Sequence, residues 1–169
     1  MNRYHVFKTS FGWCALVFRP KPPAVMEILL PADRSRLGDR LAAAGRETER
    51  LPAAVRRLAD DVRAYFDCPP HRPAVPWELL DFADMTPLQR RVLEVTAAIP
   101  LGQTRSYSQV AADSGIPRAA RFVGNTMARN PFPIVVPCHR VVRADGSPGL
   151  FGGGTKLKRR MLRLEGLPY

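Results

Sequence analysis

Residues 106–129 read SYSQVAADSGIPRAARFVGNTMAR, and this stretch sets the architecture of the second half of the chain. Ser106 and Gln109 stand three positions apart, the spacing of a capping box, which predicts a short helix over 107–113. A glycine-containing turn follows, and the next residues predict a second helix over 118–129. Two short helices joined by such a turn form a helix-turn-helix.

The second predicted helix has the composition of a surface that contacts a polyanion. Small side chains let its backbone approach a partner closely, and interleaved arginines match phosphate groups with their planar, forked donors. A solvated helix face with no partner is the alternative for the same pattern. The residues concerned are Arg118, Ala119, Ala120, Arg121, Gly124, Ala128 and Arg129.

Downstream of these helices, residues 137–141 read PCHRV. The thiolate is the nucleophilic form of cysteine, and it needs a nearby base or positive charge. His139 and Arg140 offer both next to Cys138. A buried, inert cysteine is the alternative for an isolated Cys-His pair, because free cysteine is among the most buried residue types.

A carboxylate stands at an unfavourable place near the end of the chain. Residues 156–164 alternate basic and apolar side chains and predict a helix, and Glu165 follows at its C-terminal end. A negative charge there opposes the helix dipole. We therefore expect Glu165 to have a specific partner, and a histidine is the natural one.

The charge of the chain points to a polyanionic partner. Its 26 basic and 15 acidic residues give a formal net charge of +11, and most of the basic residues are arginine. Nucleic acid is the first candidate partner. The alternative is a general arginine bias with a solvated basic surface.

The cysteines and the first residues indicate an intracellular, cytoplasmic protein with free thiols. The chain has three cysteines, which cannot all pair with one another, and residues 1–10 are polar and charged. No apolar run approaches the length of a membrane span. We expect no metal, because ligand-like spacing is incomplete in the one possible set, Cys14, Cys68, His5 and His71.

The whole chain predicts an α+β protein with two domains. Residues 1–80 predict a small α/β domain with a short β-sheet, and residues 84–169 predict a mainly helical domain that holds the helix-turn-helix. Four prolines make residues 68–76 a linker that cannot continue a helix. The strands are expected over 11–18 and 24–30, and helices over 37–41, 51–66 and 87–99, the last capped by Thr86 with Pro87 at its first position.

The segment from Arg118 to Val142 resembles the active-site region of the O6-alkylguanine-DNA alkyltransferases, which are also called the methylated-DNA–protein-cysteine methyltransferase family. The Pro-Cys-His-Arg-Val motif carries the resemblance, together with an Asn-Pro pair eight residues before the cysteine. The upstream helix-turn-helix, the glycines 152–154 and the helix that ends before Glu165 also match. The resemblance covers about residues 84–166, and the first 80 residues match only loosely.

The resemblance implies a catalytic set of four residues. Cys138 would take the alkyl group, His139 would act as base through a water, and Glu165 would orient His139. Asn130 would order the active-site turn. Tyr107 would press on the target phosphate, and Arg121 would fill the space vacated in the base stack.

The resemblance also implies two sets of contacts. Phe151 stands where a tyrosine is common, so one hydroxyl near the leaving base is missing. The expected pocket for the extruded base comprises Tyr107, Met127, Pro133, Val141, Phe151, Gly152 and Gly153. The expected DNA contacts are Arg118, Ala119, Ala120, Arg121, Gly124 and Arg129.

The implied activity is direct-reversal DNA repair. An alkyl group would pass from O6-alkylguanine, and from O4-alkylthymine, to Cys138 after nucleotide flipping. Because nothing in the sequence suggests a step that removes the resulting thioether, we expect one turnover per molecule. The implied partner is double-stranded DNA with alkylated bases, without cofactor or membrane, and the protein would act as a monomer or assemble cooperatively on DNA.

Four other classes of protein compete with this interpretation. Cys138 argues against a non-catalytic alkyltransferase-like damage-binding protein. A helix-turn-helix regulator would not explain the combination of Cys138, His139 and Glu165. A zinc-dependent deaminase would need a second cysteine three positions after Cys138, where Val141 stands. A cysteine hydrolase would turn over repeatedly.

Overall fold

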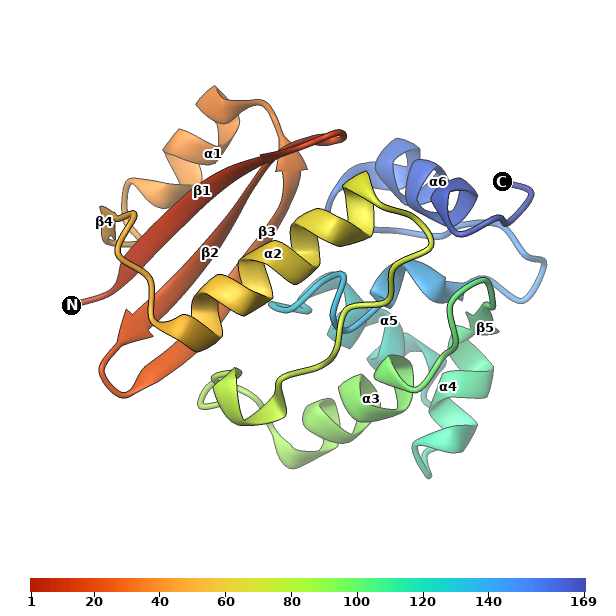
Figure 1. The fold of residues 1–169 in the computed structure, drawn as a ribbon. Coiled ribbons are helices and arrows are strands. Elements are labelled where there is room, and N and C mark those ends of the chain that lie inside the picture. Colours follow the sequence, from red (N-terminus) through yellow and green to blue (C-terminus); the bar gives the residue numbers. More distant parts are fainter. The chain divides into compact units, whose positions relative to one another are not determined.

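The computed structural model describes residues 1–169, which divide into two compact units, Met1–Phe82 and Ala83–Tyr169 (Figure 1). The first unit contains a four-stranded sheet and the second is mainly helical, so the predicted α+β class is confirmed. None of the helices combines the length and the apolar character that crossing a membrane requires.

The sheet of the first unit has the strand order β3-β2-β1-β4. The strands β1, β2 and β3 pair antiparallel, and β4 pairs parallel to β1. The bounds are β1 Arg3–Thr9, β2 Gly12–Pro20, β3 Pro23–Ala32 and β4 Arg46–Glu47.

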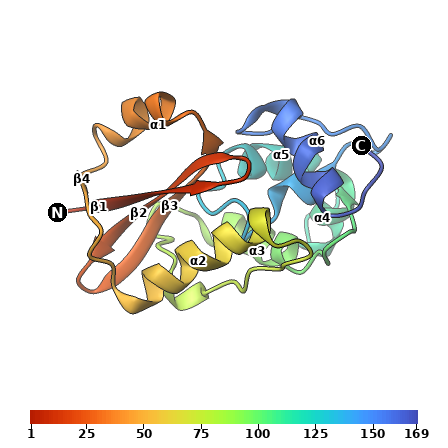
Figure 2. The same cartoon turned by 45° about the horizontal axis from the view of Figure 1, so that its top comes forward.

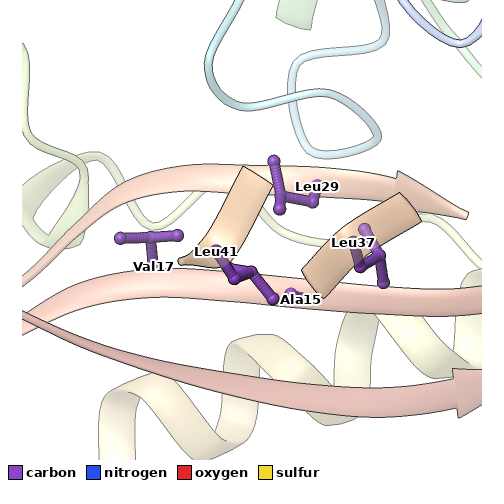
Figure 3. Packing of buried hydrophobic residues seen from close by; sticks show 5 residues of the cluster. All are labelled: Ala15, Val17, Leu29, Leu37 and Leu41. Atoms are coloured by element: carbon purple, nitrogen blue, oxygen red, sulfur yellow. The ribbon is translucent and has the colours of Figure 1, made fainter. Parts of the chain in front are cut away.

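Two helices cover opposite faces of this sheet (Figure 2). Every residue from Cys14 to Phe18 is buried, because β2 packs on both of its faces and its apolar run is continuous. Figure 3 shows one of the two layers, in which Leu37 and Leu41 pack on Ala15, Val17 and Leu29. The helices are α1, Arg34–Leu41, and α2, Ala53–Asp67.

The structure differs from the sequence-based prediction at the start of the chain. Strand β1 was not predicted, because its buried positions include His5 and Thr9, which do not produce an alternation of apolar and polar residues. Helix α1 begins at Arg34, three residues before the predicted start, because only Leu37 and Leu41 of this polar helix are buried.

The proline-rich linker ends on the sheet of the first unit. After the short 3-10 turn η1, Trp77–Leu79, Leu80 forms a parallel bridge with Val25. The backbone N–H of Asp81 also donates to the carbonyl oxygen of Val25 at 2.8 Å. These contacts fasten the chain to β3 immediately before the second unit begins.

The second unit is built on two capped helices. Helix α3 begins after Thr86 and helix α4 after Ser106, and in both the hydroxyl accepts from the backbone of a glutamine three residues later. Each glutamine side chain returns a bond to the capping residue, so both capping boxes are complete. The helices are α3 Pro87–Ala97, α4 Tyr107–Asp113, α5 Ala120–Ala128 and α6 Gly154–Leu164.

Helix α4 has the predicted limits, whereas α5 is shorter than predicted. Arg118 lies in the turn before α5, and the backbone N–H of Ala119 donates to the carbonyl oxygen of Ile116 at 2.9 Å. Arg129 stands just beyond the last helical residue. The helix-turn-helix is therefore present with a longer turn than the pattern indicated.

A short parallel ladder connects the start of α4 to a distant segment. Arg105 pairs with Val141 and Ser106 with Val142, in strands β5, Arg105–Ser106, and β6, Val141–Val142. Strand β6 directly follows the 3-10 turn η2, Cys138–Arg140. The ladder therefore holds the first residue of α4 beside the Cys-His turn.

The helical packing of the second unit can be tested with one pair of variants on α3. Leu93→Ala removes a fully buried side chain and should lower the free energy of unfolding by about 2–5 kcal/mol, through lost transfer free energy and a cavity. Leu88→Ala makes the same change at a side chain that is 39% exposed, and it should alter stability by less than about 0.5 kcal/mol. Urea unfolding of both variants measures the difference, and equal losses would contradict the packing described.

Candidate active site

Cys138 lies in a turn that is held by an asparagine. The amide Nδ2 of Asn130 donates to the carbonyl oxygen of Val136 at 3.0 Å, and its Oδ1 accepts from the backbone N–H of Phe132 at 2.9 Å. Between them, Ile134 has a φ of 79°, a left-handed conformation that is strained for a β-branched residue. The hydrogen bonds of Asn130 therefore hold the strained backbone segment that leads to Cys138.

A buried carboxylate stands at the centre of the site. His139 Nε2 lies 2.6 Å from Oε1 of Glu165, so the histidine partner expected from the position of Glu165 is present. Arg140 also donates to both oxygens of Glu165, through Nε at 2.8 Å and Nη2 at 2.9 Å. The side chains of all three residues are almost completely buried.

The same network extends to the loop after α3. Arg140 Nη1 donates to the carbonyl oxygen of Ile99 at 2.7 Å, and the backbone N–H of Gly102 donates to Oε2 of Glu165 at 3.2 Å. Every donor of the network therefore finds an acceptor on a different segment. A buried hydrogen-bond network of this kind rigidifies the segments that it joins.

Electrostatics fixes the protonation of the histidine–carboxylate pair. Burial alone would raise the pKa of Glu165, but hydrogen bonds from His139 and Arg140 lower it to about 2. Burial lowers the pKa of His139, so its imidazole is neutral at neutral pH. A carboxylate only accepts hydrogen bonds, so Nε2 carries the hydrogen and Nδ1 is the basic nitrogen of the ring.

The cysteine itself rests as a thiol. Burial raises the pKa of Cys138, while the hydrogen bond with Asn130 and the charge of Lys158 lower it. The sequence suggested that Arg140 supplies the positive charge beside the thiol, and this is wrong. The guanidinium of Arg140 is paired with Glu165, and the ammonium that acts on Cys138 belongs to Lys158.

Lys158 is a site residue that the sequence analysis missed. It is fully buried, its Nζ donates to the carbonyl oxygen of Val141 at 2.6 Å, and burial lowers its pKa to about 8. The same Nζ lies 5.8 Å from the ring centroids of both Tyr107 and Phe151. Lys158 stands three residues before the apolar Met161, and this spacing could have placed it on the apolar face of α6 from the sequence.

Tyr107 lies between helix α5 and the loop that precedes α6. A Cβ atom at Gly124 of α5 would lie 3.9 Å from two ring carbons of Tyr107. On the other side, the hydroxyl of Tyr107 donates to the carbonyl oxygen of Leu150 at 3.4 Å. Burial raises the pKa of Tyr107, so the hydroxyl keeps its proton.

The remaining predicted residues lie in the site, elsewhere in the buried part of the second unit, or at the surface. Val141 and Phe151 contact Lys158 and so belong to the site, whereas Met127 is buried beside α3, with its Sδ 3.7 Å from Thr96 Oγ1. Pro133 is buried in the turn, where it bridges Val136. The exposed predicted residues are Arg118, Arg121, Arg129, Gly152 and Gly153, and the half-buried ones are Ala119, Ala120 and Gly124.

The side chains considered for a metal do not form a cluster of potential ligands. His71 pairs with Asp61 at 2.8 Å and His5 lies 3.5 Å from Glu49. Cys14 is buried and Cys68 is exposed. No group of three or more His, Cys, Asp or Glu side chains is arranged to hold a metal ion.

Comparison with known proteins points to one family. The family model of the 6-O-methylguanine DNA methyltransferase, DNA binding domain, matches residues 87–167. The methylated-DNA–protein-cysteine methyltransferase of Methanothermobacter thermautotrophicus is 47% identical over 120 residues, which are 69% of this chain and 64% of that protein. The Mycobacterium bovis protein of the same name is 40% identical over 119 residues, 68% of this chain and 67% of its own.

Solved structures agree over almost the whole chain. The O6-methylguanine methyltransferase of Mycobacterium tuberculosis is 30% identical, with a TM-score of 0.69, over 98% of this chain and 93% of that chain. A structure of the same bacterium's OGT in complex with DNA gives a TM-score of 0.71 at 30% identity, over 96% and 92% of the two chains. The Pyrococcus kodakaraensis O6-methylguanine-DNA methyltransferase gives 0.71 at 26% identity, over 99% and 100%.

The central carboxylate should control both stability and its dependence on acid. Glu165→Gln should cost about 3–5 kcal/mol at pH 7, because it leaves the buried Arg140 without a counter-charge. Folding lowers the pKa of Glu165 from 4.5 to about 2. The ionised carboxylate therefore stabilises the folded state fully above pH 4.5, and this stabilisation is lost as the pH falls from 4.5 to about 2.

Urea unfolding at a series of pH values between neutral and acid measures both effects. The variant should be less stable than the parent and should lack this part of the acid dependence. Glu94→Gln is the matched control, because Glu94 pairs with Arg90 at the surface and the change should cost less than about 1 kcal/mol. An acid profile of Glu165→Gln that parallels the parent's would contradict the assignment.

Proposed function

Because the chain belongs to the O6-methylguanine DNA methyltransferase family, we propose that it repairs DNA by moving an alkyl group from O6-alkylguanine directly to Cys138. O4-alkylthymine is a second substrate of the same class. The observation that carries the proposal is the buried Cys138 thiol beside the His139–Glu165 pair, in the unit that also holds the helix-turn-helix.

The chemistry is a single displacement at the alkyl carbon. The sulfur of Cys138 forms a bond to this carbon, the bond from the carbon to O6 breaks, and guanine leaves after it takes up a proton. The product on the protein is a thioether. Nothing in the site offers a nucleophile placed to remove it, so each molecule reacts once.

Activation of the thiol follows from the protonation states in the site. Neutral His139 accepts the Cys138 proton at Nδ1 through a water, and Glu165 stabilises the imidazolium that forms. The ammonium of Lys158 then stabilises the thiolate. Arg140 holds Glu165 and takes no part in the proton transfer.

The DNA-binding side of the site explains how a base reaches the cysteine. A base inside a duplex is inaccessible and must be extruded, which costs a few kcal/mol. The exposed Arg121 of α5 fills the vacated stack and Tyr107 presses on the target phosphate. The net charge of +11 supports binding to double-stranded DNA, and we place the protein inside the cell, as a monomer at each lesion.

The alternative functions leave the site unexplained. A helix-turn-helix regulator does not need a cysteine coupled to a buried histidine and carboxylate. A damage-binding relative without catalysis does not need Cys138. A test of the reaction therefore separates all three.

Cys138→Ser should abolish alkyl transfer and leave DNA binding close to the parent level, because the exposed arginines that contact DNA are unchanged. Cys14→Ser and Cys68→Ser are the matched controls and should keep full transfer. The measurement is the mass of the protein after incubation with duplex DNA that carries O6-methylguanine. A methyl group that maps to Cys14 or Cys68, or a methylated Cys138→Ser protein, would refute the assignment.

His139 and Glu165 should act as one unit in the transfer. His139→Ala and Glu165→Gln should each slow the single-turnover rate by about 10²–10⁴-fold, and the double variant should be little slower than either. The rate is measured against pH with free O6-benzylguanine, with folding checked by thermal melting because Glu165 also holds Arg140. A folded Glu165→Gln protein that reacts at the parent rate, or two losses that multiply, would disprove the relay.

A further inference from the structure

Leu150 is an exposed apolar residue at the edge of the proposed active site. Its exposed fraction is 79%, against 39% for Leu88, which is the other exposed large apolar residue of the second unit. A single exposed leucine is ordinary on a protein surface. The position of Leu150 in the chain, between residues that belong to the site, is what gives it a role.

The backbone on the first side of Leu150 fits closely against Tyr107. Gly149 has a φ of +69°, and a Cβ atom there would lie only 2.8 Å from the hydroxyl of Tyr107. That hydroxyl donates to the carbonyl oxygen of Leu150 itself. The main chain of Leu150 is therefore held at Tyr107 while its side chain remains in solvent.

The residue on the second side is also held. The ring of Phe151 is half-buried, and its centroid lies 5.8 Å from Nζ of Lys158, which lies at the same distance from the ring of Tyr107. Leu150 thus projects from a loop that is anchored on both sides to the residues of the site. An anchored, exposed side chain contacts a partner with little loss of conformational entropy.

Helix α5 lies on the other side of Tyr107, where Gly124 faces the ring. Arg121 stands one helical turn before Gly124 and is exposed to solvent. The helix on one side of Tyr107 therefore carries an exposed cation, and the loop on the other side carries an exposed apolar side chain. A leucine has no donor for a phosphate, so its complementary surface on DNA is apolar.

We propose that Leu150 packs on the apolar surface of a nucleotide next to the extruded one, formed by deoxyribose C–H groups and the exposed base face. This inference rests on the proposed function and adds a second, uncharged DNA contact opposite Arg121. Apolar side chains of minor-groove proteins pack against base steps in the same way. The contact holds the opened duplex and takes no part in the chemistry at Cys138.

The experiment compares Leu150→Ala with Leu88→Ala, which makes the same change at an exposed residue outside the site. Leu150→Ala should slow transfer from a duplex that contains O6-methylguanine by about 3–10-fold, as expected for the loss of a partly buried leucine. Its rate with free O6-benzylguanine should equal the parent rate. Leu88→Ala should match the parent on both substrates, and Leu150→Met should restore the duplex rate.

Salt dependence separates this contact from a charged one. In the Cys138→Ser background, which cannot react, Leu150→Ala should weaken binding to a duplex that contains O6-methylguanine without a change in the slope of log Kd against log salt, because an apolar contact releases no counterions. Arg118→Ala, which removes an exposed arginine expected at the phosphates, should reduce the slope by about one phosphate contact. A Leu150→Ala protein that repairs the duplex at the parent rate, or that loses equally on both substrates, would overturn the inference.

Failure of the proposed function gives a different result. In that case the parent protein transfers no alkyl group from either substrate, whatever residue stands at position 150. The binding measurement then still decides the contact, since it needs no transfer. Equal affinities of Leu150→Ala and Leu88→Ala for the duplex would overturn it.

Discussion

The carboxylate of Glu165 is the interaction on which the arrangement of the site depends. It is buried, it accepts from His139, Arg140 and the backbone of Gly102, and so it ties the end of α6 to the Cys-His turn and to the loop after α3. A buried charge is costly unless every lone pair is used. Here the donors come from two segments and the carboxylate from a third, so the same bonds that stabilise the charge define the positions of all three segments.

The electrostatics around Cys138 suits a reagent that is used once. Burial keeps the sulfur protonated and unreactive at rest, while a neutral imidazole and a buried ammonium stand ready to stabilise the thiolate. A permanently ionised thiol would be exposed to oxidation and other side reactions. The site therefore couples reactivity to the arrival of a substrate rather than to the resting state of the protein.

Local patterns in the sequence predicted the parts of the structure that local physics determines. The limits of α4 follow from Ser106 and Gln109, and the start of α3 follows from Thr86 and Pro87. The unfavourable place of Glu165 predicted a histidine partner, which is His139. Strand β1 escaped prediction because His5 and Thr9 occupy its buried face. Lys158 lies in a run of basic residues, and only its position on the apolar face of α6 indicates that it is buried. The pairing of Arg140 with Glu165 could not be predicted, because it depends on the tertiary fold.

The two-residue parallel ladder between β5 and β6 has a consequence for how such a protein can change. It connects the start of the helix-turn-helix to the turn that holds Cys138, with Ser106 opposite Val142. The helix-turn-helix is therefore not a module that can be exchanged independently of the Cys-His turn. A different helix pair grafted at this place would keep its position relative to Cys138 only if the residues before its first helix still paired with Val141 and Val142.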